Sequence, residues 1–239
     1  MIPYFFEPTD WVENSTVQLS EASFKHCITV LRMKVGESLI LVNGQGKKAK
    51  AKLQNIEKKS ASVLIESLET TQARKSKLFM AVGFTKNRTR NEWMLEKITE
   101  IGVDVIIPLQ CTRSEREKMN VERLNQILIS AMMQSQQVFL PELKQMMSPA
   151  EAVNFFKNQT QGSILIAHCE DEDKQSLDAQ LSHTDTLILV GPEGDFSPKE
   201  IENCLALGAK PVSLGPNRLR TETATVYACS IFNQKNYAL

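Results

Sequence analysis

Two segments in the last third of the chain contain the residue types of a ligand-binding site. Residues 189–200 (LVGPEGDFSPKE) and 212–224 (VSLGPNRLRTETA) each lead from a short apolar stretch through a loop with glycine and proline into a helix start. Glycine leaves the backbone accessible, so two such loops close together can bind a small ligand through backbone N–H and C=O groups. Arg218, Arg220 and Glu222 add charge to the second loop. The two segments therefore predict a small-molecule site with charged groups beside it.

Neither loop carries a known phosphate-binding signature. Gly191-Pro-Glu-Gly194 has neither the GxGxxG spacing of dinucleotide-binding folds nor the Gly-Lys-Ser/Thr of a Walker loop. Taken alone, the first loop is equally consistent with an ordinary strand-to-helix turn. A salt-bridged helix cap on the surface explains the second loop less well, because this loop is longer than a simple connection needs and concentrates charge. Their position favours a site, because open α/β sheets bind ligands at the carboxyl ends of their parallel strands.

From Lys77 onward, apolar stretches alternate with amphipathic ones. Capping boxes at Ser148-Pro-Ala-Glu151 and Ser197-Pro-Lys-Glu200 mark two helix starts, and Gly102 ends a third helix. Continuous apolar strands separated by helices are typical of a parallel sheet covered on both faces, so the fold class is α/β. Strands are expected at 78–82, 103–109, 164–167, 187–190 and 210–214, and helices at 91–101, after Asn120, after both capping boxes, and from Thr221 or Glu222.

The first 70 residues are mostly β in pattern. A helix is expected after Ser20, and Asn43-Gly-Gln-Gly46 between two strand-like runs is a strong hairpin signal. These features predict a small β-barrel over 1–70, a linker at 69–76 and a second domain over 77–239. Strands of the barrel are expected at 2–6, 38–42, 47–53 and 60–67.

Charge and composition limit the classes of function. The formal net charge is zero, which argues against binding nucleic acid over the whole surface. Residues 1–118 contain 19 Lys and Arg against 14 Asp and Glu, whereas residues 119–239 contain 9 against 14. The first half could therefore present a basic face to a polyanion. No apolar run approaches the roughly 18 residues of a membrane span, and no signal peptide is evident, which predicts a cytoplasmic protein without membrane contact.

Cysteine and histidine usage argues against metal and disulfide sites. Five cysteines are scattered without CxxC spacing, and the three histidines are dispersed. This pattern predicts neither a disulfide framework nor a metal centre. We expect the cysteines to be small buried apolar residues.

The motifs together resemble a known family. The two C-terminal segments read GPEG-x-F-S-x-x-E and then S-L-G-x-x-x-L-R-T-E-T-A. In this order and spacing they resemble the RsmE family of the SPOUT superfamily, which methylates N3 of a uridine in 16S ribosomal RNA. Upstream matches extend the resemblance nearly end to end: His26 with Val30-Leu31-Arg32, Gly44-x-Gly46, Lys97-x-x-Glu100-x-Gly102-Val103 with Pro108, and Gln134-Ser135 with Pro141.

The resemblance implies a fold, a cofactor and partners. It implies a PUA-like RNA-binding barrel over 1–70 and a SPOUT methyltransferase domain with a trefoil knot over 77–239. It also implies a homodimer that acts on 16S rRNA of the small ribosomal subunit, and apolar stretches at 131–133 and 223–232 could supply the dimer surface. S-adenosylmethionine would be held by three loops, with Leu165, His168, Val190, Gly191, Glu193, Gly194, Leu214, Gly215, Asn217, Leu219 and Thr221 as the binding residues.

Methylation of uracil N3 requires loss of a proton, because this imide nitrogen is protonated at neutral pH. An enzyme can supply a base, or place positive charge where the uracilate develops. We expect Arg220 to take the second role, helped by the N-terminus of the last helix. Glu222 could orient Arg220 through a bidentate pair, or act as the base itself.

Basic residues in both domains are expected to contact RNA phosphates. One set lies between the first strand and the first helix of the second domain, and the other lies in the small domain. His26 is favoured as an RNA contact or a structural group over a base. The predicted RNA-binding residues are His26, Arg32, Lys34, Lys86, Arg88 and Arg90.

Three positions depart from the family pattern. Asp195 replaces the second glycine of GPEGG, Gln137 replaces an arginine, and Arg218 replaces an isoleucine. Asp195 lies at the edge of the predicted pocket. Two alternatives to a uridine-N3 methyltransferase therefore stay open: a catalytically inactive RNA-binding or ribosome-assembly protein, and a SPOUT methyltransferase with another RNA target.

Overall fold

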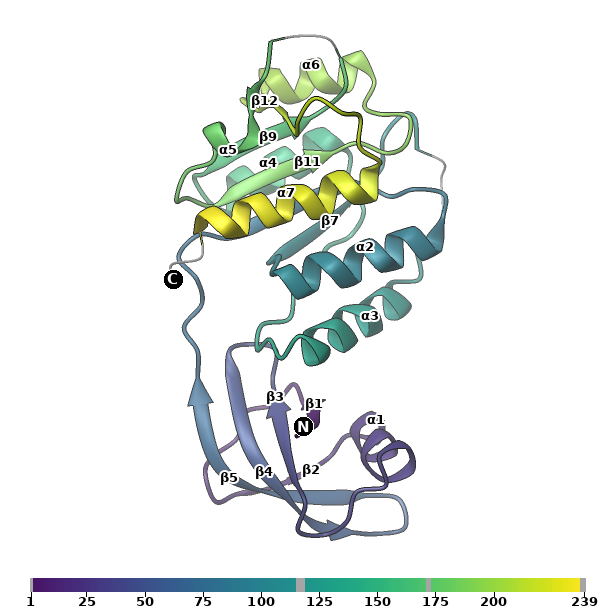
Figure 1. Ribbon diagram of the computed structural model, residues 1–239, viewed down its shortest axis with the longest axis vertical. Helices are drawn as coiled ribbons and strands as arrows, with labels where there is room; N and C mark the ends of the chain where they lie inside the picture. Colours follow the sequence, from purple (N-terminus) through teal and green to yellow (C-terminus); the bar gives the residue numbers. More distant parts are fainter. Residues whose placement is uncertain (1, 115–118, 171–172, 237–239) are drawn as a thin grey trace. The chain divides into compact units, whose positions relative to one another are not determined.

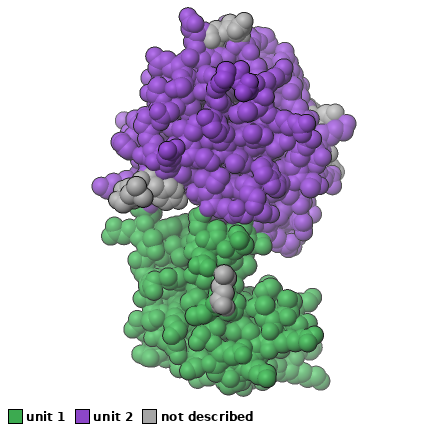
Figure 2. All heavy atoms as spheres, in the orientation of Figure 1, with its two compact units in different colours: residues 1–73, 129–140 green, residues 74–128, 141–239 purple. Residues whose placement is uncertain are grey.

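The computed structural model describes residues 2–114, 119–170 and 173–236. The chain forms two compact units, one of residues 1–73 with 129–140 and one of residues 74–128 with 141–239 (Figure 1; Figure 2). The domain bounds drawn from the sequence stay predictions. The sequence pattern did not indicate that residues 129–140 leave the second part of the chain and join unit 1.

Unit 1 is a curved mixed sheet around its own core. Its strand order is β1-β3-β4-β5-β2, with β1 parallel to β3 and every other pair antiparallel. A short helix, α1 (Glu21–Phe24), begins at the predicted cap Ser20 and continues into a π-helical segment, Lys25–Val30. The strands are β1 (Tyr4–Phe6), β2 (Thr16–Gln18), β3 (Ser38–Val42), β4 (Lys47–Ile56) and β5 (Ala61–Thr70).

Alternation of lysine with small apolar residues explains how β4 fits this sheet. Ala49, Ala51 and Leu53 are buried, while Lys50 and Lys52 between them are exposed. Successive side chains of a strand point to opposite faces, so one face joins the core and the other faces water. The Lys50 ammonium lies 3.5 Å from the Glu66 carboxylate on β5, so the exposed face carries both charges.

The predicted hairpin turn at 43–46 holds the returning segment of unit 1. The Gly46 N–H donates to the Val138 carbonyl at 2.9 Å, and the Leu140 N–H donates to the Gly44 carbonyl at 2.9 Å. Gly46 has φ +95°, and a Cβ there would lie 2.7 Å from the Phe139 ring. Only glycine fits this turn. The predicted linker at 69–76 was wrong at its start, because β5 extends through Thr70.

Unit 2 contains an all-parallel sheet, as predicted. Its order is β10-β12-β9-β11-β6-β7-β8 within the described residues, and each neighbouring pair is parallel. The central strands are buried throughout, which explains their continuous apolar runs. The strands are β6 (Leu78–Gly83), β7 (Val105–Leu109), β8 (Glu142–Leu143), β9 (Ser163–Ala167), β10 (Gln175–Ser176), β11 (Thr186–Val190) and β12 (Lys210–Ser213).

Helices cover both faces of this sheet (Figure 1). On one face α4 packs with α6, and on the other α7 packs with α2 and α5. Both predicted capping boxes are present, at Ser148 and Ser197, and Gly102 ends α2 in the left-handed conformation. The helices are α2 (Arg88–Ile101), α3 (Val121–Gln134), α4 (Pro149–Gln159), α5 (Leu177–Gln180), α6 (Pro198–Ala206) and α7 (Thr221–Asn236).

The expectation for the cysteines is confirmed at four positions and wrong at one. Cys27, Cys111, Cys204 and Cys229 are buried, and burial raises the pKa of Cys111 and Cys229 to about 12. Cys169 is exposed. None of the helices in the described ranges is both long and apolar enough to span a membrane. The trefoil knot stays a prediction.

Candidate functional site

Three loops of unit 2 enclose a cavity of about 1000 Å³ at the carboxyl edge of the sheet. They follow β9, β11 and β12, and the start of α7 closes the third loop. This is the edge at which parallel α/β sheets bind ligands. Nine residues of the predicted cofactor set line this cavity, which we call the cofactor cavity: His168, Val190, Gly191, Glu193, Leu214, Gly215, Asn217, Leu219 and Thr221.

Two residues of the predicted cofactor set do not line the cavity. Leu165 lies in the middle of β9 and is fully buried in the sheet. Gly194 is turned toward Arg113, whose guanidinium Nη1 donates to the Gly194 carbonyl at 3.0 Å. Contact of these two residues with a cofactor stays a prediction, because sequence spacing shows which loop a residue joins, but not which side of the loop it faces.

Asp195 holds two of the three loops together. Its carboxylate accepts hydrogen bonds from the Cys169 N–H at 2.7 Å and the Phe196 N–H at 2.8 Å. Its backbone has φ +61°, a left-handed conformation that glycine adopts freely and that Asp tolerates better than most residues. Asp195 therefore meets the backbone requirement of the glycine it replaces. It also adds two hydrogen bonds that glycine cannot make, which we call the Asp195 brace.

The loop after β11 is fixed on its other sides as well. The Thr221 hydroxyl at the start of α7 donates to the Gly191 carbonyl at 3.0 Å, and this bond is buried. Gly83 ends β6 against Pro192, where a Cβ would lie only 2.4 Å from the Pro192 nitrogen. Arg113 also donates to the Phe196 carbonyl at 3.2 Å. Residues 190–196, which we call the central loop, are thus held by four neighbouring segments.

Charge in the site is arranged differently from the sequence expectation. No ion pair between Arg220 and Glu222 is present in the described part of the chain. Glu222 lies instead beside Arg90, with 3.7 Å between its Oε1 and the arginine Nε. Arg90 also lies near Glu193, at 3.6 Å. The expected bidentate pair was wrong, and Arg90, expected on an RNA-binding patch, lines the cofactor cavity between two carboxylates.

Arg220 remains available to a substrate. It is exposed, lines the cofactor cavity and immediately precedes α7, and its carbonyl accepts from the Ala224 N–H at 2.8 Å. Glu222 is 8% exposed and does not line the cavity, and its Oε2 has no hydrogen-bond partner. Arg218, Lys174 and Arg90 also line the cavity, and Arg90 is the one of these four cations that lies beside two carboxylates.

The other predicted RNA-contacting residues are exposed and belong to different units. His26, Arg32 and Lys34 belong to unit 1, where the His26 ring meets Phe5 edge-on at 5.8 Å between centroids. Lys86 precedes α2 and Arg88 begins it, both in unit 2.

In residues 2–114, 119–170 and 173–236, no three His, Cys, Asp or Glu side chains form a group that could hold a metal ion.

Sequence reasoning missed two residues that shape the site. Arg113 contacts the central loop from a segment 81 residues earlier in the chain, and no local pattern signals such a contact. Lys174 also lines the cavity, and its ammonium donates to the His168 carbonyl at 2.8 Å. An isolated lysine in an acidic loop gave no sequence signal.

Burial and the Asp195 carboxylate raise the pKa of Cys169, so this cavity thiol is protonated at neutral pH.

Fold and site together define an α/β protein that binds a small ligand at the carboxyl edge of a parallel sheet. Comparison with known proteins gives the family. A sequence model of an RNA methyltransferase domain matches residues 72–233, and one of an RNA methyltransferase PUA domain matches residues 19–66. The chain belongs to this RNA methyltransferase family.

Relatives match the chain over almost its whole length. Ribosomal RNA small subunit methyltransferase E of Rickettsia conorii is 31% identical over 90% of this chain and 88% of its own. A probable rRNA-methyltransferase from Porphyromonas gingivalis has a similar crystal structure, with 34% identity, a TM-score of 0.87 and 98% of both chains covered. The methyltransferase E of Neisseria gonorrhoeae, bound to S-adenosyl methionine, shares 26% identity, a TM-score of 0.87 and the same coverage.

The Asp195 brace can be tested without any ligand. Replacing Asp195 by Ala removes both acceptors, so we expect the Cys169 amide to exchange with solvent roughly 10- to 150-fold faster, in line with the roughly 1.5–3 kcal/mol of a hydrogen bond to a charged group. Hydrogen exchange with mass spectrometry measures this. The matched control is Glu202→Ala, an exposed carboxylate on α6. Unchanged exchange at Cys169 in Asp195→Ala would show that the bond does not order the loop.

Proposed function

We propose that this chain uses S-adenosylmethionine to methylate N3 of a uridine in 16S rRNA of the small ribosomal subunit, in the cytoplasm. The observation that supports this most strongly is the cofactor cavity at the sheet edge, with Arg220 at its rim, in a chain that belongs to an RNA methyltransferase family. The Neisseria gonorrhoeae relative binds S-adenosyl methionine. The names of the curated relatives support the small-subunit RNA as substrate.

The residues of the cofactor cavity fit an adenosine with a charged sulfonium tail. Val190, Leu214 and Leu219 supply apolar walls for a base. Gly215 has φ +119° and Gly191 is tightly packed, so backbone rather than side chains faces a ligand at these points. When bound, the cofactor supplies a methyl group on positively charged sulfur.

The remaining chemistry is stabilisation of a uracil anion by the chain. Loss of the N3 proton leaves negative charge on the imide, and the Arg220 guanidinium at the start of α7 places positive charge beside it. The helix N-terminus adds partial positive charge of the same sign. Glu222 is buried beside Arg90 and away from the cavity surface, so we assign it to positioning Arg90.

RNA binding is divided between the two units. The PUA match in unit 1 supports RNA contact by this unit, through His26, Arg32 and Lys34. Lys86 and Arg88 provide exposed cations on unit 2. Contacts of this kind add affinity without reading sequence, because they bind phosphate.

We further propose that two copies of the chain form a homodimer through α2 and α7. These helices pack together and expose Trp93 and Tyr227, each 45% accessible. A contribution from 131–133 stays a prediction, although Ala131 and Met132 are already buried in the single chain.

Light scattering at micromolar concentration should give twice the chain mass of 26.9 kDa. The double variant Trp93→Ser with Tyr227→Ser should shift the mass toward the monomer, because it removes the apolar contact area. The control is Val12→Ser, which changes an exposed apolar residue of unit 1. A monomeric wild-type chain would contradict the dimer.

The proposed reaction is tested by methyl transfer from labelled S-adenosylmethionine to small ribosomal subunits and, separately, to naked 16S rRNA. The wild-type chain should yield 3-methyluridine. Arg220→Ala should lower kcat about 10²- to 10³-fold, the usual loss when a transition-state charge stabiliser is removed, while cofactor affinity stays within about threefold. The exposed Lys199→Ala on α6 is the control.

Each part of the proposal has its own contradicting result. If the wild-type chain transfers no methyl group and binds no cofactor, the inactive RNA-binding alternative is favoured. If it methylates another base or another RNA, the substrate assignment is wrong. If Arg220→Ala keeps its rate within a few-fold, the charge-stabilisation role is wrong although the reaction stands.

A further inference from the structure

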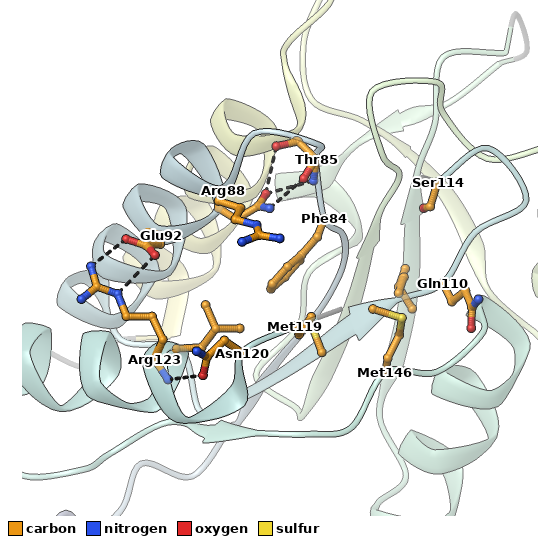
Figure 3. A pocket seen from close by; sticks show the side chains of 13 residues that line it. Phe84, Thr85, Arg88, Glu92, Gln110, Ser114, Met119, Asn120, Arg123 and Met146 are labelled. Atoms are coloured by element: carbon orange, nitrogen blue, oxygen red, sulfur yellow. Dashed lines mark hydrogen bonds and ion pairs between the residues drawn. The ribbon is translucent and has the colours of Figure 1, made fainter. Parts of the chain in front are cut away.

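A second cavity lies in unit 2, apart from the cofactor cavity. Its volume is about 170 Å³, and its walls come from the connection between β6 and α2, the end of β7 and the start of α3. Phe84, Met119 and Met146 point toward one another across the hollow, and the Arg88 guanidinium extends beside the Phe84 ring (Figure 3). Among the described residues, none that lines this cavity also lines the cofactor cavity.

The two cavities share one edge of one sheet. The second lies at the carboxyl ends of β6 and β7, and β6 is the direct neighbour of β11, whose loop builds the cofactor cavity. The first turn of α2 separates them: Arg88 lines the second cavity, and Arg90, two residues later, lines the cofactor cavity. A chain of nucleotides bound at this edge would therefore pass both.

The walls of the second cavity are fixed by interactions within the chain. The Asn91 amide oxygen accepts from the Thr85 N–H and hydroxyl, both at 2.9 Å, and the Asn91 Nδ2 donates to the Thr85 carbonyl at 2.7 Å. At the rim, Arg123 donates to Glu92 at 3.0 Å and lowers the pKa of that carboxyl, so the pair persists at neutral pH. The cavity is therefore preformed.

The lining of the second cavity favours a flat heteroaromatic ligand. One aromatic ring and two thioethers offer polarisable surfaces for stacking, and the Gln110 amide offers hydrogen bonds to ring edges. The volume is below the roughly 300–1,000 Å³ of pockets for drug-sized ligands, so it suits a single ring system rather than a whole nucleotide. Proteins read single-stranded RNA by this combination of stacking and edge contacts.

We propose that the second cavity binds an unpaired nucleobase next to the methylated uridine, so that the enzyme reads a second base of its RNA. This inference rests on the proposed function, because it takes the RNA substrate from it. It gives Phe84 a base-stacking role, separate from the phosphate contacts of the neighbouring cations, and assigns recognition of the base identity to edge contacts such as that of Gln110.

The test is RNA affinity of Phe84→Leu, which keeps an apolar side chain but removes the ring. Filter binding to 16S rRNA, with excess unrelated RNA as competitor, should show about tenfold weaker binding, as expected for one lost base-stacking contact. The slope of log affinity against log salt should not change, because no phosphate contact is lost. Cofactor affinity by calorimetry should stay within about twofold.

Phe155→Leu is the matched control, since Phe155 lies on α4 against the core of unit 2 and lines neither cavity. Gln110→Ala removes a polar lining group while leaving the ring, and should also weaken RNA binding. Equal RNA affinity of Phe84→Leu and the control would overturn the proposal, as would a changed salt slope or a parallel loss of cofactor affinity. These readouts need no methyl transfer, so they separate failure of the cavity assignment from failure of the proposed reaction.

Discussion

The cofactor end of the sheet depends on the immobilisation of the central loop, residues 190–196. Glycine and proline loops have no regular hydrogen-bond ladder, so other groups must fix them. Here Asp195 bonds to the loop after β9, Thr221 bonds from α7, and Arg113 bonds from the segment after β7. The contact between Gly83 and Pro192 leaves no room for a side chain. Segments distant in sequence thereby hold the central loop in place.

The arrangement of these loops also decides which arginines of the site are paired with carboxylates. Arg90 lies between Glu193 and Glu222, whereas the Arg220 guanidinium lines the cavity and has no ion pair with any described residue. A guanidinium that is already paired with carboxylates stabilises a developing anion poorly. An exposed guanidinium at the start of a helix can stabilise that anion well. The first turn of α2 therefore contributes to both cavities. Arg90 lies beside two carboxylates at the cofactor cavity, and Arg88 lines the second cavity.

Much of this architecture could be predicted because it depends on residues that are close together in the sequence. The capping boxes at Ser148 and Ser197, the helix end at Gly102 and the buried strands of unit 2 all depend on residues adjacent in sequence. What could not be predicted depends on distant residues. The bond from Arg113 to Gly194 and the docking of 138–140 on the turn at Gly46 are examples. Very short elements such as β8 and β10 were missed because two residues show no periodicity.

The candidate site shows the same division. Nine of the expected cofactor residues line the cavity because the loops were found correctly from their glycines and prolines. The pairing of Glu222 was wrong because i, i+2 proximity suggested Arg220, while the fold brings Arg90 from α2 to it. The sequence showed Asp195 as a departure from the family pattern. Its role could be recognised only from the structure, which brings the Cys169 N–H to its carboxylate.

A crystal structure of the chain with S-adenosylmethionine would test the central claim most directly. The account predicts the adenine between the loops after β9, β11 and β12, contacted by Gly191 and Gly215, with the methyl group facing Arg220. Cofactor bound outside these loops, or a methyl group directed away from Arg220, would contradict it.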